Sequence, residues 1–170
     1  FDLWKAIRRR AFPGMVSNHH LGTMLGLLLA AVEMNAFRDE YQPQVIANAR
    51  AFARALAAEG VAVEGDPDLG YTETHQVLVN VGYGEGARVA RRLEDRNIVL
   101  NYQALPEDEG FTASSGLRMG VAEKTRFGMD EPDFEEFAGL FAAALRDEPG
   151  IGEEVAGFRD RFQTLRYTFD

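Results

Sequence analysis

The sequence predicts an α+β domain in which helices cover a small, largely antiparallel sheet. The apolar residues recur with a helical period through the first 60 residues and again after residue 130. Between these regions the pattern changes to short strands with one helix among them. After an opening helix, the predicted order is therefore helix–helix–strand–strand–helix–strand–strand–helix–helix, with no linker or repeat.

The first part of the chain is predicted to be helical. An opening amphipathic helix includes Trp4, which we expect in the core, and Phe12-Pro13-Gly14 ends this helix. A second helix from about His20 to Ala36 is apolar nearly all round, so it is predicted to be buried. A separate helix from about Glu40 to Glu59 has one apolar face, and Gly60 ends it.

The middle of the chain is predicted to form four short strands and one helix. In the second strand His75 alternates with valines, and we expect it to be packed and hydrogen-bonded. The segment Gln103–Thr112 follows no regular pattern, because proline, glycine and acidic residues cluster there. The predicted strands are Val61–Val63, His75–Val81, Ile98–Leu100 and Gly116–Gly120, and the helix is Gly84–Arg96.

Two helices close the chain. Asp130 and Pro132 are typical of a helix start, and phenylalanines with helical spacing follow them. Val155 and Phe158 mark the last helix. Between the last predicted strand and these helices, the charged run Glu123–Arg126 is interpreted as a solvated surface.

Composition excludes several classes of function. Lys and Arg number 18 against 27 Asp and Glu, and the net charge of −9 argues against a nucleic-acid or anionic-membrane binder. The absence of Cys excludes disulfides, Cys-ligated metals and thiol catalysis. The apolar run Leu21–Val32 is shorter than the ~20 residues of a spanning helix. We therefore expect a cytoplasmic protein, and no metal site is predicted.

Two places are candidates for ligand binding. Arg118 lies in a short strand and faces away from Leu117 and Met119, so it is either an ordinary exposed residue or a carboxylate anchor. Ser17 and Asn18 precede a helix, where they either cap it or mark an N-terminus that binds phosphate. No nucleophile–base–acid triad is visible, so no catalytic residue is predicted.

Five blocks occur along the chain in an order that matches one known family. They are Phe12-Pro13-Gly14 before a long helix, Glu40-Tyr41-Gln42, the strand with Thr74-His75-Gln76, Asn97–Asn101 with Pro106, and Ser115–Gly120 followed by Thr125-Arg126. Together they resemble serine hydroxymethyltransferase, a family of pyridoxal-phosphate enzymes of the aspartate aminotransferase fold type (fold type I). The resemblance fades after about Gly150, and it implies the small C-terminal domain of that fold.

The resemblance implies roles for single residues. Arg118 matches the arginine that binds the carboxylate of the substrate amino acid. Ser17 and Asn18 fall in the loop that reaches the cofactor phosphate of a neighbouring subunit, which implies at least a homodimer. Gln103 stands where the family has an Asn that contacts tetrahydrofolate, and Tyr102 stands where it has a Lys.

The lysines limit what this chain does by itself. Only Lys5 and Lys124 are present, and neither lies in the Thr-Thr-x-His-Lys-Thr motif that supplies the Schiff-base lysine in the family. The chain also begins on Phe1 rather than Met. The resemblance thus implies the C-terminal part of a longer enzyme, inactive alone. Residues 1–40 would be a lead-in segment and long helix from the large-domain boundary, and residues 41–170 the small domain.

Three functions follow from these observations. The first is part of an enzyme that interconverts serine and glycine with pyridoxal phosphate and passes the one-carbon unit to tetrahydrofolate. The second is a folate-independent aldolase or transaldolase for β-hydroxy amino acids, because Tyr102 and Gln103 depart from the family at the folate side. The third is a non-catalytic dimerisation module whose interface is the helix containing Leu21–Val32.

Overall fold

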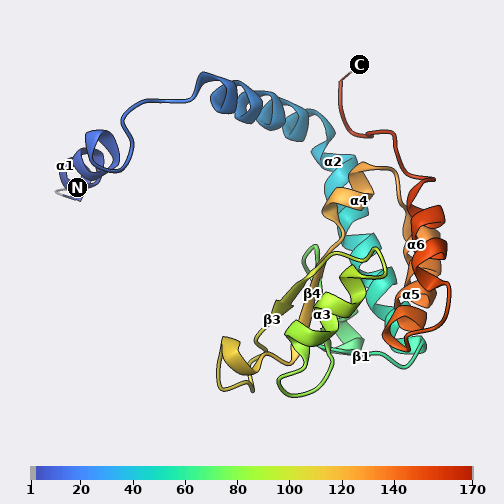
Figure 1. Ribbon diagram of the computed structural model, residues 1–170. Helices are drawn as coiled ribbons and strands as arrows, with labels where there is room; N and C mark the ends of the chain where they lie inside the picture. Colours follow the sequence, from blue (N-terminus) through green and yellow to red (C-terminus); the bar gives the residue numbers. More distant parts are fainter. Residues whose placement is uncertain (1–2, 170) are drawn as a thin grey trace.

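A small antiparallel sheet with helices packed against it forms the body of the protein, and a long helix extends from this body (Figure 1). The computed structural model describes residues 3–169. The sheet has four strands in the order β1-β2-β4-β3, and all neighbouring pairs are antiparallel. These observations confirm the predicted α+β fold class.

The strands and the later helices occur in the predicted order, and several of their bounds differ from the predicted ones. The strands are β1 (Ala62–Val63), β2 (Gln76–Asn80), β3 (Asn101–Gln103) and β4 (Gly116–Gly120). The helices are α1 (Leu3–Arg9), α2 (Leu21–Ala58), α3 (Gly86–Glu94), α4 (Ala122–Arg126), α5 (Glu131–Leu145) and α6 (Ile151–Arg159).

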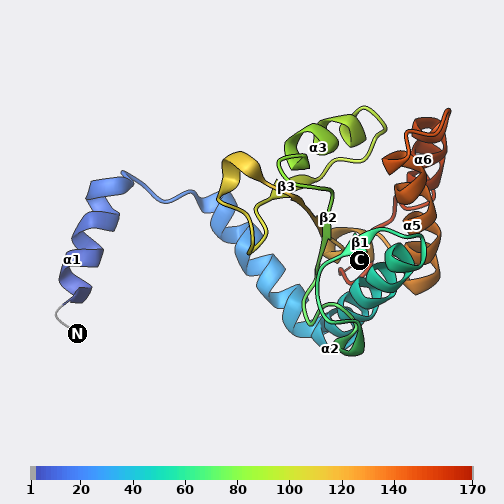
Figure 2. The same ribbon diagram turned by 90° about the horizontal axis from the view of Figure 1, so that it is seen from below.

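One continuous helix replaces the two that were predicted between His20 and Glu59. α2 runs for 38 residues through the expected break, because residues 37–42 contain neither Gly nor Pro. Pro43 lies inside the helix, where it lacks the N–H for one backbone hydrogen bond and crowds the carbonyl four residues earlier. Figures 1 and 2 both show a bend in α2 in the region that contains Pro43.

The first half of α2 is exposed, which contradicts the predicted burial. Its large apolar side chains, from Leu21 to Val32, keep 48–71% of their surface exposed. Trp4 is also exposed rather than in the core. By length and composition α2 would be able to cross a membrane, and the apolar window lies near the N-terminus. Its second half, by contrast, is packed in the domain core.

Within residues 3–169, helices pack against one face of the sheet and not against the other. Val77 and Val79 of β2 pair with Met119 and Leu117 of β4, and all four side chains are buried on one face. α2 and α3 contact the strands, and α5 packs against α2 and α3. A cluster of phenylalanines joins α2, α5 and α6, with Phe52 stacked 5.6 Å from Phe137 and Phe137 5.7 Å from Phe158. On the other face Leu78 and Arg118 are only partly buried and Asn101 is exposed, so this face is open.

The third strand begins three residues later than predicted. Asn97 adopts a left-handed backbone (φ 64°), and the Ile98 amide donates to the Leu93 carbonyl at 2.9 Å. These residues therefore close the end of α3 instead of entering the sheet. Pairing with β4 starts only at Asn101, so the predicted strand Ile98–Leu100 is wrong.

The predicted start of the helix after residue 130 is confirmed. The Asp130 side chain accepts a hydrogen bond from the Asp133 amide, and the Asp133 side chain accepts one from the Asp130 amide. This reciprocal pair satisfies N–H groups that have no partner within the helix. Pro132 lies in the first turn, where its missing N–H costs nothing.

Candidate functional site

Arg118 stands at the middle of the open face of the sheet. In β4 it lies between Leu78 of β2 and Asn101 of β3, and its neighbours along the strand face the core. The side chain is half-buried, and among residues 3–169 its guanidinium has no ion pair or hydrogen-bond partner. A half-buried guanidinium with five free donors is suited to bind a carboxylate or phosphate through two parallel hydrogen bonds.

Two glycines flank Arg118 on the same face, and they differ in their surroundings. A Cβ on Gly116 would lie 2.7 Å from Leu105 Cδ2 and 2.8 Å from the Gln103 carbonyl oxygen. Only glycine fits there, because those atoms already cover the position. A Cβ on Gly120 would have its nearest neighbour at 3.6 Å, on the ring of His75. The space beside Arg118 is thus filled on one side and open on the other.

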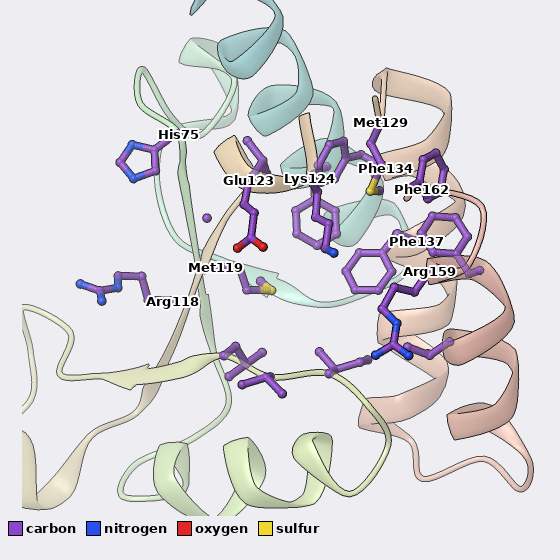
Figure 3. Close-up of a pocket in the computed structure, with 18 of the residues that line it drawn as sticks. His75, Arg118, Met119, Glu123, Lys124, Met129, Phe134, Phe137, Arg159 and Phe162 are labelled. Atoms are coloured by element: carbon purple, nitrogen blue, oxygen red, sulfur yellow. The ribbon is translucent and has the colours of Figure 1, made fainter. Parts of the chain in front are cut away.

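A groove of about 480 Å³ begins at Arg118 and His75 and passes the end of the sheet toward α5 and α6 (Figure 3). Figure 3 shows Arg118 and His75 at one end and Phe137, Phe162 and Arg159 at the other. Its wall is mainly apolar and includes Ile98, Leu100, Met119, Met129, Phe134, Phe137, Val155, Phe158 and Phe162.

The rim of this groove is positively charged although the protein is acidic. Among the described lining residues, Arg118, Lys124 and Arg159 are cationic and Glu123 is the one carboxylate. The Lys124 ammonium lies 5.3 Å from the centre of the Phe127 ring. His75 is exposed and lies just before β2, so the prediction that it is packed and hydrogen-bonded is wrong. Such a rim favours an anionic ligand.

The loop between β3 and β4 is organised by one carboxylate that the sequence did not indicate. Asp108 accepts hydrogen bonds from the Leu105 and Ser115 amides, each at 2.8 Å, and from the Ser115 hydroxyl. These bonds, that of the Ser115 hydroxyl foremost, lower the pKa of Asp108 below its usual value. Asp108 thereby fixes the loop that follows Gln103, whose half-buried side chain donates to the Ala104 carbonyl.

Ser17 and Asn18 lie apart from the open face, on the segment between α1 and α2 (Figure 1). Both are exposed. Neither caps α2: the N-cap position is His20, and its side chain makes no capping hydrogen bond. The interpretation of Ser17 or Asn18 as an N-cap is therefore wrong. In the part of the chain that the structure describes, no side-chain cap occupies the N–H groups at the start of α2, which suits an anion.

The charged run Glu123–Arg126 is not the solvated surface that was predicted. It forms α4, in which Thr125 is fully buried. Thr125 accepts a hydrogen bond from Asn48 at 2.8 Å, and Arg126 forms an ion pair with the buried Glu33. No local pattern signals this pair, because its members are 93 residues apart.

Comparison with known proteins gives consistent matches over most of the chain. The family model described as "Serine hydroxymethyltransferase" matches residues 1–141. Serine hydroxymethyltransferases from Saccharolobus islandicus and Archaeoglobus fulgidus are each 42% identical to this chain over 175 residues, and one from Pyrobaculum aerophilum is 43% identical over 171. Each alignment covers 99% of this chain and 40% of the relative, so the chain spans about two fifths of their length.

A solved structure has the same fold over nearly the whole chain. It is the L-threonine transaldolase from Pseudomonas fluorescens, with a TM-score of 0.84 and 30% sequence identity. The match covers 94% of this chain and 37% of that protein. The proteins that this chain resembles therefore include one that is named for a second activity.

Proposed function

This chain belongs to the serine hydroxymethyltransferase family, and on that premise we propose that it is the small-domain part of a pyridoxal-phosphate enzyme that interconverts serine and glycine. In the whole protein the one-carbon unit would pass to tetrahydrofolate. The observation that supports this proposal best is the guanidinium of Arg118 on the open face of the sheet, which has no partner within residues 3–169. Residues 1–40 would lead in from the large domain, and residues 41–170 would form the small one.

Arg118 would bind the carboxylate of the amino-acid substrate. Two charge-assisted hydrogen bonds hold a carboxylate in one plane, so they fix the direction of the other bonds at the α-carbon. The backbone of β4 is hydrogen-bonded on both sides, which limits movement of the anchor. Fixing the orientation of a bound substrate lowers the entropy cost of reaching the reactive geometry.

The residues present fit the anionic groups of pyridoxal phosphate, although they do not supply its lysine. The N–H groups near Ser17 and Asn18, at the exposed start of α2, would hold the phosphate of a cofactor in a neighbouring subunit. When bound, this cofactor supplies an electron sink for negative charge at the substrate α-carbon. Lys5 lies on α1 and Lys124 beside Phe127, and neither is proposed as the Schiff-base lysine. The chain alone would be inactive.

A folate-independent aldolase or transaldolase is the second candidate. The match to a threonine transaldolase structure favours it, as do Tyr102 and Gln103 in β3 at the position proposed for folate. Gln103 would contact tetrahydrofolate in the first candidate and would be free for another role in the second. A non-catalytic dimerisation module remains the third candidate, based on the exposed apolar half of α2.

The test measures serine cleavage by the whole protein with Arg118→Leu and Arg118→Lys. Loss of two charge-assisted hydrogen bonds predicts that kcat/KM falls about a hundredfold or more with Arg118→Leu. Arg88→Leu is the matched control, because Arg88 is an exposed arginine of α3 that pairs with Glu85. Undiminished kcat/KM in Arg118→Leu would contradict the proposed role. Equal rates with and without tetrahydrofolate would favour the transaldolase, and no turnover at all would favour the module.

A further inference from the structure

The bend of α2 divides this helix into two arms, and the angle between the arms depends on what stabilises the bend. Pro43 has no N–H to donate, so the helix lacks one backbone hydrogen bond at the bend. The arm before the bend leads to the segment with Ser17 and Asn18, and the arm after it is packed in the domain core (Figure 2). A missing hydrogen bond leaves the angle dependent on contacts outside the helix.

Glu33 in the first arm is held by two groups from distant parts of the chain. Arg126 of α4 donates to one of its carboxylate oxygens, and the Thr168 hydroxyl donates to the other. Glu33 is 5% exposed, so these partners replace water around its charge. The hydrogen bond from Thr168 and the nearby Arg126 lower the pKa of Glu33 below its usual value, which is consistent with an ionised carboxylate.

The tail after α6 follows the same face of α2. Glu33, Phe37 and Tyr41 are spaced four residues apart, so they lie one above the other on this helix. The Phe169 ring lies 5.5 Å from Phe37, and the Tyr167 ring lies 5.1 Å from Tyr41. Three successive tail residues, 167–169, thus contact three successive turns of α2, which is more than one chance contact would give.

α4 is fastened to the second arm of α2 by Asn48, and at the bend by Tyr41. The Tyr41 hydroxyl, two residues before Pro43, donates to the Ala122 carbonyl at 2.9 Å. The Asn48 amide nitrogen donates to Thr125 Oγ1 at 2.8 Å and to the Met129 carbonyl at 2.9 Å, and this site is fully buried. Arg126 therefore moves with the second arm, whereas its partner Glu33 belongs to the first.

We propose that Arg126 and Thr168 are positioning residues that brace the bend of α2 by holding Glu33. The brace connects the first arm to α4, which directly follows the strand that bears Arg118. It therefore fixes the direction in which the segment around Ser17 and Asn18 leaves the domain relative to Arg118. The role rests on the proposed function, in which that segment and Arg118 each act on a bound anion.

A buried ion pair suits such a brace. Removal of either partner leaves a charge in a site with little water, and this state is strongly unfavourable. The Arg126 side chain is 25% exposed and the Glu33 side chain 6% exposed, in contrast to the surface pair of Arg88 and Glu85, which is 66% and 40% exposed. The two pairs have the same chemistry, but only the first joins two elements across the bend.

Spin-label distances between the two arms test the brace. The chain contains no Cys, so Leu28→Cys and Leu69→Cys place labels at two exposed positions, one on the first arm and one in the small domain. We expect a single narrow distance distribution in the parent chain. Arg126→Met and Thr168→Val should broaden or shift it, Arg126→Lys should restore part of it, and the control Arg88→Met should leave it unchanged.

The outcomes separate the brace from the proposed function. An unchanged distribution in both Arg126→Met and Thr168→Val overturns the brace, and broadening in only one of them assigns the brace to that residue alone. Circular dichroism identifies a variant that has unfolded. If Arg126→Met unfolds, the distance distribution of Thr168→Val decides the test, because this variant removes only a single hydroxyl from the tail. In the whole protein, the brace predicts that Arg126→Met lowers kcat more than it raises KM for serine. Broadening without any serine turnover in the parent protein would support the brace and overturn the proposed function.

Discussion

The two halves of α2 differ in hydrophobicity and in surroundings, and the more apolar half is the more exposed one. From Leu21 to Val32 the large apolar side chains are about half or more exposed, whereas Val45, Phe52 and Leu56 in the second half are buried. The same helix continues through both halves, so propensity does not separate them. The difference shows that an apolar run predicts packing against other apolar groups. It does not indicate whether those groups belong to the same chain or to another one. In this structure the second half is covered and the first is not.

Truncation of one leucine in each half gives the largest expected contrast. Leu56→Ala should lower the free energy of unfolding by about 2–5 kcal/mol, because the side chain is fully buried and leaves a cavity. Leu28→Ala should change it by no more than about 0.5 kcal/mol, because Leu28 is 60% exposed. Urea denaturation of both variants measures the difference. Equal losses would mean that Leu28 is covered in solution.

Polar substitution in the first half tests whether it is an interface. Leu25→Ser with Leu28→Ser removes two exposed apolar side chains, and burial of each is worth about 1.5–3 kcal/mol. If this half packs against another protein chain, association should weaken at least about tenfold, as measured by sedimentation over a range of concentrations. Leu69→Ser, at an exposed apolar residue elsewhere, is the control. The same association constant in the double variant would argue against this surface.

Acidification tests Glu33, the buried residue that follows the exposed apolar run of the first half, and has the smallest expected effect. The pKa of Glu33 is lowered in the fold, by the Thr168 hydroxyl first and then by Arg126, from an ordinary value of 4.5. Its contribution to stability is therefore full above pH 4.5 and is lost as the pH falls through the lowered pKa. The Phe169 amide and these two side chains are the groups that face it.

Thermal melts between pH 7 and pH 3 measure this contribution. The parent chain should melt at a higher temperature than Glu33→Gln at pH 7, and the difference should shrink at the acid end. Glu40→Gln, at an exposed position of the same helix, controls for the general effect of acid. A difference that persists undiminished at the lowest pH would show that the Glu33 charge is not what stabilises the contact.

Sequence periodicity was sufficient for the architecture because most elements carry local signals. The alternation in β4 placed Arg118 opposite Leu117 and Met119, and Asp130 and Pro132 marked the start of α5 correctly. The strand predicted at Ile98–Leu100 failed because a hydrogen bond to α3 takes those residues out of the sheet. That bond depends on the left-handed backbone at Asn97, which no apolar pattern reveals.

The parts of the site that were missed depend on residues far apart in the chain. Glu33 meets Thr168 over 135 residues and Arg126 over 93, so neither contact has a characteristic spacing. Asp108 lies in a segment without periodicity, where its three hydrogen bonds decide the loop shape. The roles of Arg118, Ser17, Asn18 and Gln103, the domain boundary at residue 40 and the cytoplasmic location stay predictions.

The unlike glycines beside Arg118 have a consequence for how this site can evolve or be redesigned. Gly116 is closed to substitution, because Leu105 and the Gln103 carbonyl occupy the place of any Cβ. Gly120 has room for a methyl group next to His75. Variation at Gly120 would therefore change the size of the acceptable ligand while the anchor keeps its position. The site has one fixed and one adjustable wall, and selection for a new substrate would act on the adjustable wall first.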